Sequence, residues 1–243
     1  MKKTILTTAI LLVALTGLWA FQFSPLEQTF SPTGENSIKT YVVVNDSDEP
    51  VAVSISLYQR DQDENGNEIR KACNDFQVQP QKVVVMPQST VMVRVRYTGS
   101  PTVSVEKSYR LVAEQIPYSQ GKNQTEGVMF NFLYVYATSL YVSPAESKIS
   151  IDVPQVKPGV DEEGNKVLEV TLRNRGNVHQ VLMDAKLVLT SSDGNSITLE
   201  GDAIKGIDYF NLLARKTVTR TIPWPEGFEP EGKVTATLRY SQQ

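Results

Sequence analysis

The side chains best suited to catalysis or metal binding are scarce in this chain, which has one histidine, His179, and one cysteine, Cys73. A site built on several histidines or thiolates is therefore excluded. A nucleophilic triad would have to use His179, which lies in a turn-like segment, residues 173–179, after an expected strand. Cys73 sits in a polar stretch without a visible base partner, so we expect an incidental thiol that forms no intramolecular disulfide.

Motifs for other chemistry are missing from the sequence as well. We find no Gly-x-Ser-x-Gly elbow, P-loop or dinucleotide-binding fingerprint. Glu162 and Glu163 are adjacent carboxylates in a hydrophilic loop, and we expect them to be solvated. A glycosidase-type pair of acids that lie far apart in the chain stays open. We therefore expect no catalytic residues, no metal site and no cofactor.

The N-terminus has the pattern of a secretory signal peptide. Lys2 and Lys3 precede an uncharged, largely apolar run over residues 4–20 that ends in the small residue Ala20. A membrane anchor is the alternative, but threonines interrupt the run and it is shorter than the roughly 20 apolar residues of a spanning helix. We expect residues 1–20 to be cleaved, the mature chain to begin at Phe21, and no stable membrane insertion.

The charge balance argues against nucleic-acid binding. The chain has 24 Lys and Arg against 27 Asp and Glu. Without Lys2 and Lys3 the net charge becomes 22 − 27 = −5. Proteins that bind nucleic acids usually carry a strong basic excess instead.

Strand patterns dominate the rest of the sequence. Several segments are β-branched or alternate apolar with polar residues, and turn-forming residues separate them. The clearest are residues 41–44, 51–58, 91–97, 167–172 and 234–238. Short strands at this spacing predict an all-β protein made of sandwiches or barrels.

A domain boundary is expected after Pro144, where one strand pattern stops and a polar segment follows. The predicted domains are residues 21–144 and 145–243, each close in size to an immunoglobulin-like β-sandwich. Because the linker is short, we expect the two domains to meet in a fixed, angled arrangement.

Four segments, in this order, carry a resemblance to a known family. Residues 85–95 look like a proline turn followed by an arginine-bearing strand, and residues 106–117 like a Glu-Ser-aromatic strand that ends in Glu-x-Ile-Pro. Residues 170–179 contain Asn-x-Gly-Asn-x-His, and residues 212–223 look like the strand before a last hairpin. Together they resemble the PapD-like chaperones of pilus and fimbrium assembly in the periplasm. An exported adhesion or structural protein with immunoglobulin-like domains is the alternative.

The resemblance implies a function and a site. Chaperones of this family lend a strand to pilus subunits that lack their last strand, which is donor-strand complementation. It implies pilus or fimbrial subunits and an outer-membrane usher as partners. The donor strand would be residues 128–136, and we expect its even face to bind the subunit: Val128, Phe130, Phe132, Tyr134 and Tyr136. Both faces are apolar, so a strand buried in the core would look the same.

The chain departs from the family pattern at its basic anchors. The family clamps a subunit's C-terminal carboxylate with an arginine and a lysine, but Glu27 and Ser139 stand near those positions. No Lys or Arg occurs in residues 21–37 or 124–146, so the clamp does not carry over. Arg94 and Glu106 match charged positions that help to orient the family's two domains, and we expect them to be structural.

Overall fold

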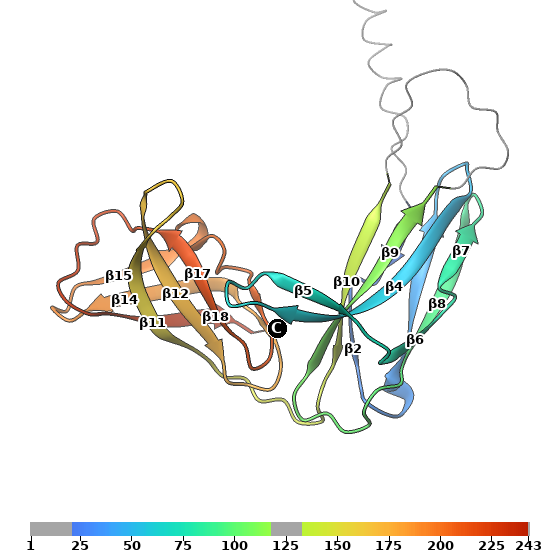
Figure 1. Cartoon of the computed structure of the whole chain (residues 1–243), viewed down its shortest axis with the longest axis horizontal. Coiled ribbons are helices and arrows are strands. Elements are labelled where there is room, and N and C mark those ends of the chain that lie inside the picture. The colour runs from blue at the N-terminus through green and yellow to red at the C-terminus, as the bar shows by residue number, and fades with distance from the viewer. Residues whose placement is uncertain (1–20, 118–132, 243) are drawn as a thin grey trace, which may run out of the picture.

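The computed structural model describes residues 21–117 and 133–242, and the expected signal peptide lies outside them. The described chain is almost entirely β-structure, arranged as two β-sandwich domains set at an angle (Figure 1). The first domain contains ten strands: β1 (Gln22–Ser24), β2 (Glu27–Phe30), β3 (Ile38–Asn45), β4 (Val51–Gln62), β5 (Glu68–Ala72), β6 (Phe76–Gln79), β7 (Lys82–Val85), β8 (Ser89–Tyr97), β9 (Lys107–Ile116) and β10 (Val135–Val142).

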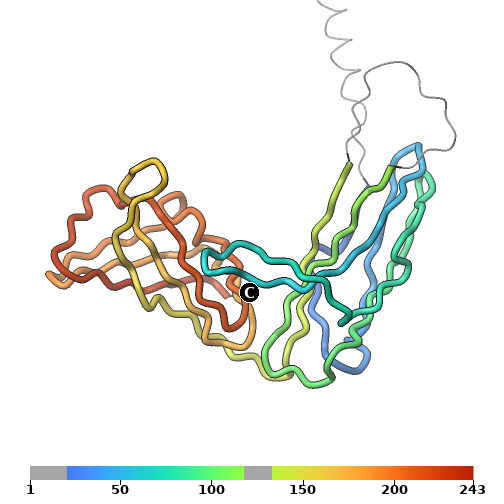
Figure 2. The backbone as a smooth tube through the Cα atoms, in the orientation of Figure 1, coloured from blue at the N-terminus to red at the C-terminus, as the bar shows by residue number. Residues whose placement is uncertain are grey.

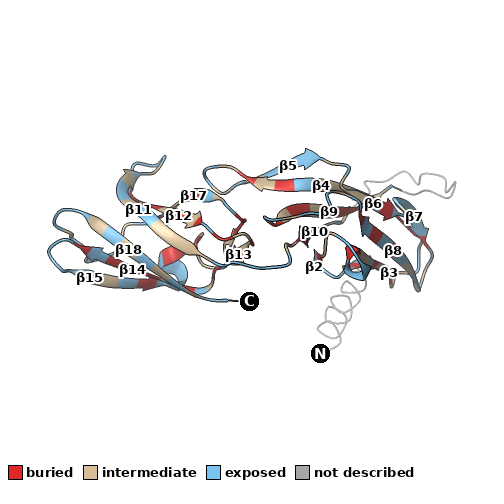
Figure 3. Cartoon of the chain, turned by 90° about the horizontal axis from the view of Figure 1, so that it is seen from below, coloured by how far each residue is buried: buried red, intermediate tan, exposed pale blue. Residues whose placement is uncertain are grey.

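These strands form two sheets that face each other. One has the order β1-β3-β8-β6, and the other has the order β2-β10-β9-β4-β5, with β7 paired to β4. The expected alternation is clear in β8, where Val93, Val95 and Tyr97 are buried while Met92 and Arg94 are exposed. Neighbouring residues therefore point alternately into the core and into solvent (Figure 3).

The second domain has its own core and its own sheets. Its strands are β11 (Ile151–Val160), β12 (Lys166–Asn174), β13 (Gln180–Val181), β14 (Met183–Ser191), β15 (Ser196–Glu200), β16 (Asn211–Leu212), β17 (Thr217–Pro223) and β18 (Val234–Ser241). They form the sheets β11-β12-β17, β13-β16 and β15-β14-β18. Leu168, Val170 and Leu172 of β12 are fully buried and share the core with Leu187 and Leu189 of β14.

Pro144 lies in the connection between β10 and β11, and no sheet among the described residues mixes strands from its two sides. The boundary itself stays a prediction. The hairpin of β4 and β5 leaves the first domain and reaches the second, as the tube in Figure 2 shows. Strand β5 is exposed along most of its length (Figure 3). Among the described residues, no helix is long and apolar enough to cross a membrane.

Candidate functional site

Strand β10 has a backbone edge that is only half covered. Along its whole length β10 pairs with β9 in antiparallel fashion. On its other side β2 pairs with it in parallel, from Ser139↔Glu27 to Val142↔Phe30. Among the described strands, none pairs with this side of Val135–Thr138. Such an edge presents backbone N–H and C=O groups on which another strand can form a ladder.

The side chains of β10 and of the residues just before it separate into an inward and an outward face. Tyr136 points inward: its ring lies 5.0 Å from that of Phe21, and its hydroxyl donates a 2.7 Å hydrogen bond to the Phe21 carbonyl. Tyr134 is also half-buried against the core. The outward side chains are exposed, 49% for Leu133 and 56% for Val135. The free edge therefore carries an aliphatic face.

This placement bears on the predicted subunit-binding residues. Val128, Phe130 and Phe132 lie outside the described residues, so their role stays a prediction. Tyr134 and Tyr136 lie against the core of the first domain. The outward neighbours Leu133 and Val135, which belong to the other face of the same strand, are the ones exposed beside the open edge.

The outward face of β10 leads to a group of charged side chains near the second domain. Ser139 lies opposite Arg110 of β9, whose guanidinium donates a 2.6 Å hydrogen bond to the Ser139 hydroxyl. Glu68 of β5 contacts three guanidinium groups: Arg110 at 2.7 Å, Arg60 at 2.9 Å and Arg70 at 2.6 Å. We call this group, Glu68 with its three arginines, the arginine cluster. Its formal charge is 3 − 1 = +2.

Burial and the neighbouring charges shift the pKa values of two members of this cluster, Glu68 and Arg60. Partial burial disfavours the carboxylate of Glu68, but hydrogen bonds from Arg110 and Arg70 outweigh it and lower its pKa to about 2. Burial, together with the charge of Arg110, lowers the pKa of Arg60. The Arg60 guanidinium also donates a 3.2 Å hydrogen bond to the hydroxyl of Tyr141, which is fully buried on β10. The cluster is thus connected through Tyr141 to Asn211 of the second domain.

The sequence prediction missed these basic residues because it searched only the segments that form β2 and β10. Arg110 lies on β9 directly opposite Ser139 of β10, so it stands beside the position that was searched. On the next strand, β4, Tyr58 lies opposite Arg110, and Arg60 is two residues further along. Arg110 stands inside residues 106–117, the most specific part of the resemblance. Its position in that strand is the sequence signal that could have found it.

Glu106 lies between the domains. Its carboxylate accepts hydrogen bonds from the backbone N–H of His179 at 2.9 Å and from the hydroxyl of Ser143 at 2.7 Å. It also lies 2.6 Å from Nδ1 of His179, whose ring stacks on Tyr141 with centroids 3.6 Å apart. Arg94 is exposed on β8, and within the described residues its side chain forms no hydrogen bond or ion pair with the second domain. The structural roles predicted for both stay predictions, and only Glu106 touches the interface.

The β4–β5 hairpin, which we call the interdomain hairpin, fastens the two domains together. The Gln62 amide donates to the Asn211 carbonyl at 2.8 Å and accepts from the backbone N–H of Leu213 at 3.0 Å. Asp61 forms an ion pair with Lys216 at 2.5 Å. At the tip, the Arg220 guanidinium donates to the Asn65 carbonyl at 2.8 Å. These contacts, made outside the linker, fix the two domains relative to each other.

Groups for catalysis do not gather around this site. Within residues 21–117 and 133–242, no cluster of three His, Cys, Asp or Glu side chains is arranged to hold a metal ion. Cys73 is half-buried, and burial raises the pKa of its thiol, which disfavours the reactive thiolate. The site is therefore suited to binding a chain at a strand edge. The absence of catalysis stays a prediction.

The described chain thus forms two β-sandwich domains set at an angle, with an open strand edge on β10 of the first domain. Residues 31–148 match the family of pili and flagellar-assembly chaperones, PapD N-terminal domain. This match places the first domain in the PapD N-terminal domain family.

Solved structures share the whole two-domain fold. A chain of the CsuC–CsuE chaperone–tip adhesion subunit pre-assembly complex, from archaic Csu pili of Acinetobacter baumannii, is 15% identical with a TM-score of 0.60, covering 92% of this chain and 96% of that one. The class 5 fimbriae chaperone CfaA is 15% identical with a TM-score of 0.55, covering 91% and 100%. A chain of the SafA pilin–SafB chaperone complex of Salmonella enterica is 15% identical with a TM-score of 0.53, covering 92% and 98%. Comparison with curated protein sequences gives no match.

Proposed function

We propose that this protein is a periplasmic chaperone that binds pilus or fimbrial subunits by donor-strand complementation along β10. The observation that carries the proposal is the open backbone edge of Val135–Thr138 beside the exposed side chains of Leu133 and Val135. Family membership and the resemblance to structures of chaperone–subunit complexes support the same function.

Strand addition explains why the site combines these features. A subunit that lacks its last strand exposes apolar core residues and unpaired backbone groups. The open edge of β10 supplies backbone hydrogen bonds, while Leu133 and Val135 enter the subunit's groove. The other residues predicted from the sequence, Val128, Phe130 and Phe132, belong to the even face and lie outside the described residues, so their role stays a separate prediction. Covering both edges at once also prevents strand-mediated aggregation.

Arg110 provides the positive charge that β2 and β10 lack. It lies beside Ser139, near the point where the family has its lysine, and the arginine cluster carries a formal excess of 3 − 1 = +2. We propose that Arg110, supported by Arg60, holds the C-terminal carboxylate of the bound subunit, since guanidinium groups bind carboxylates in bidentate fashion.

The remaining parts of the proposal follow from this role. Subunits would be received after export, so residues 1–20 act as a cleaved signal peptide and the protein works in the periplasm. An outer-membrane usher is the second partner, to which the loaded chaperone delivers its subunit. The protein performs no catalysis, because binding and release of a strand require none.

Site-specific photo-crosslinking tests the proposal directly. The full chain is co-expressed with strand-deficient pilus subunits, and p-benzoylphenylalanine replaces Val135 on the open edge. We expect an adduct between the chaperone and a subunit. The matched control is the same replacement at Met92, which is 71% exposed on β8 in the other sheet. Adducts at Met92 without adducts at Val135 would place the subunit on the other sheet and overturn the proposal.

A further inference from the structure

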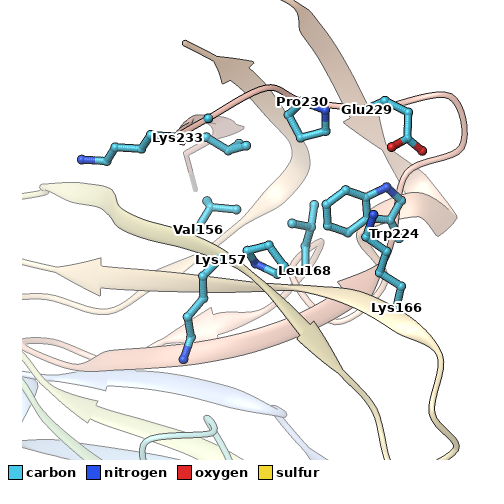
Figure 4. Close-up of a pocket in the computed structure, with 11 residues that line it drawn as sticks. Val156, Lys157, Lys166, Leu168, Trp224, Glu229, Pro230 and Lys233 are labelled. Carbon is cyan, nitrogen blue, oxygen red and sulfur yellow. The ribbon is translucent and has the colours of Figure 1, made fainter.

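The second domain contains a pocket that the proposed function does not use. It has a volume of about 320 Å³ and lies between β11, the start of β12 and the segment that leads into β18. Figure 4 shows Trp224 and Lys166 at one end, Lys233 at the other, and Val156 and Leu168 between them. The apolar part of the lining consists of Val156, Pro158, Leu168, Trp224, Pro230 and Val234. The size is at the lower end of the range for small-molecule sites.

The charged groups of the lining are predominantly positive. Lys157 is neutralised by Glu169, at 2.9 Å on the neighbouring strand. The Lys166 ammonium lies 3.6 Å from the centroid of the Trp224 ring. Among the described residues, neither Lys166 nor Lys233 forms an ion pair with a carboxylate. Glu229 is the one acidic residue of the lining, so two unpaired ammonium groups outnumber it.

The pocket wall is fixed before any ligand arrives. The Trp224 indole N–H donates a 3.0 Å hydrogen bond to the carbonyl of Phe228, whose side chain is buried in the core. Pro223 and Pro225 flank Trp224, and their rings restrict the backbone on both sides. Lys166 is held over the indole by cation–π attraction. A preformed wall of this kind lowers the entropy cost of binding a small ligand.

We propose that this pocket binds a small amphipathic carboxylate with a flat apolar body. The apolar body packs on Leu168, Val156 and Val234, and the carboxylate pairs with Lys166 at the edge of Trp224. The apolar floor favours a ligand with a ring or a short apolar chain, and the unpaired ammonium groups favour an anion. The pocket belongs to the second domain, so its test does not depend on subunit binding at β10.

The test follows the indole N–H signal of Trp224 in the ¹⁵N-labelled full chain, titrated with 4-phenylbutyrate. The sequence has two tryptophans, Trp19 and Trp224, and the Trp224→Phe variant identifies the signal. For a ligand of this size we expect saturable binding at about millimolar concentration. The uncharged 4-phenylbutan-1-ol should bind roughly three- to fivefold more weakly, as should 4-phenylbutyrate to Lys166→Gln.

The matched control removes the charge of a lysine outside the pocket. Lys186 lies on β14, outside the pocket lining, and pairs with Glu200 at 2.6 Å. Lys186→Gln should therefore leave the affinity unchanged. The proposal is overturned if the Trp224 signal does not move up to about 10 mM ligand. Equal binding of the alcohol and the acid, or equal losses in Lys166→Gln and Lys186→Gln, would overturn it as well.

Discussion

Glu68 holds three arginine side chains together in the arginine cluster. Its own side chain is 23% exposed, and that of Arg60 is 7% exposed. A buried guanidinium that loses its carboxylate partner is costly, because its charge is then both desolvated and unpaired. At the scale of single residues, Glu68 therefore sets the position of Arg110, the group proposed to hold the subunit's carboxylate.

We predict that Glu68→Gln lowers the free energy of unfolding at pH 7 by about 1–3 kcal/mol. The folded-state pKa of Glu68 is about 2, below the ordinary value of 4.5. A depressed carboxyl pKa stabilises the fold above pH 4.5, and this contribution is lost as pH falls toward 2. In urea denaturation over this range, the free energy of unfolding should decrease less steeply with falling pH for Glu68→Gln than for the wild type.

Glu200→Gln is the control for this prediction. Glu200 is 60% exposed and pairs with Lys186, which is 53% exposed, so its loss should cost less than about 0.5 kcal/mol. If Glu68→Gln and the wild type have the same stability at pH 7 and parallel acid profiles, the arginine cluster does not stabilise the fold as described.

At the scale of elements, two hairpins with the same turn chemistry have different neighbours. In both turns an aspartate side chain accepts backbone N–H groups, Asp63 from Asn67 and Asp161 from Asn165, and the glycine has a positive φ. Among the described contacts, only the first turn reaches across to the other domain, whereas the second turn lies within the second domain and projects away from its neighbours. A Cβ on Gly66 would lie 2.7 Å from the Phe210 ring, whereas a Cβ on Gly164 would meet nothing within 4 Å.

We predict that Gly66→Ala destabilises the protein more than Gly164→Ala. Both substitutions carry the left-handed backbone cost of about 1 kcal/mol. Gly66→Ala adds a steric clash at the tip of the interdomain hairpin, worth about another 1 kcal/mol. The comparison is made by urea denaturation of the two variants and the wild type. Equal losses in both would mean that the hairpin tip is not packed against the second domain.

At the scale of elements, the sequence could predict the strand at β10 but not which of its faces points into the core. The residues around β10 are apolar at both even and odd positions, so periodicity alone left two orientations open. Phe21 and Phe23 decide between them, because they pack on Tyr136 and draw the even face inward. These aromatic contacts join segments more than a hundred residues apart (|i−j| is 115 for the Tyr136–Phe21 hydrogen bond) and leave no local pattern.

At the scale of the whole molecule, the all-β class and the two angled sandwiches were predictable because alternation and turns are local signals. The family comparison and the structure confirm this fold class. The arrangement of the side chains between the domains was less predictable, because it depends on lateral strand register and on the interdomain hairpin. Gln62 and Asp61, which fasten that hairpin to the second domain, stood in no motif.

The central claim is that the outward face of β10 binds the subunit while the inward face belongs to the core. The most direct measurement compares two variants of the full chain, the double variant Leu133→Ser/Val135→Ser and the single variant Tyr136→Ser. Each is co-expressed with a strand-deficient subunit, and both subunit co-purification and the thermal melt are measured. The double variant removes about 2 kcal/mol of apolar burial from the complex, which weakens binding roughly thirtyfold. Its melt should match the wild type, because both side chains are already half exposed. Tyr136→Ser should lower the melt instead, through lost ring packing and the lost bond to Phe21. Undiminished co-purification of the subunit with the Leu133 and Val135 double variant would contradict the account.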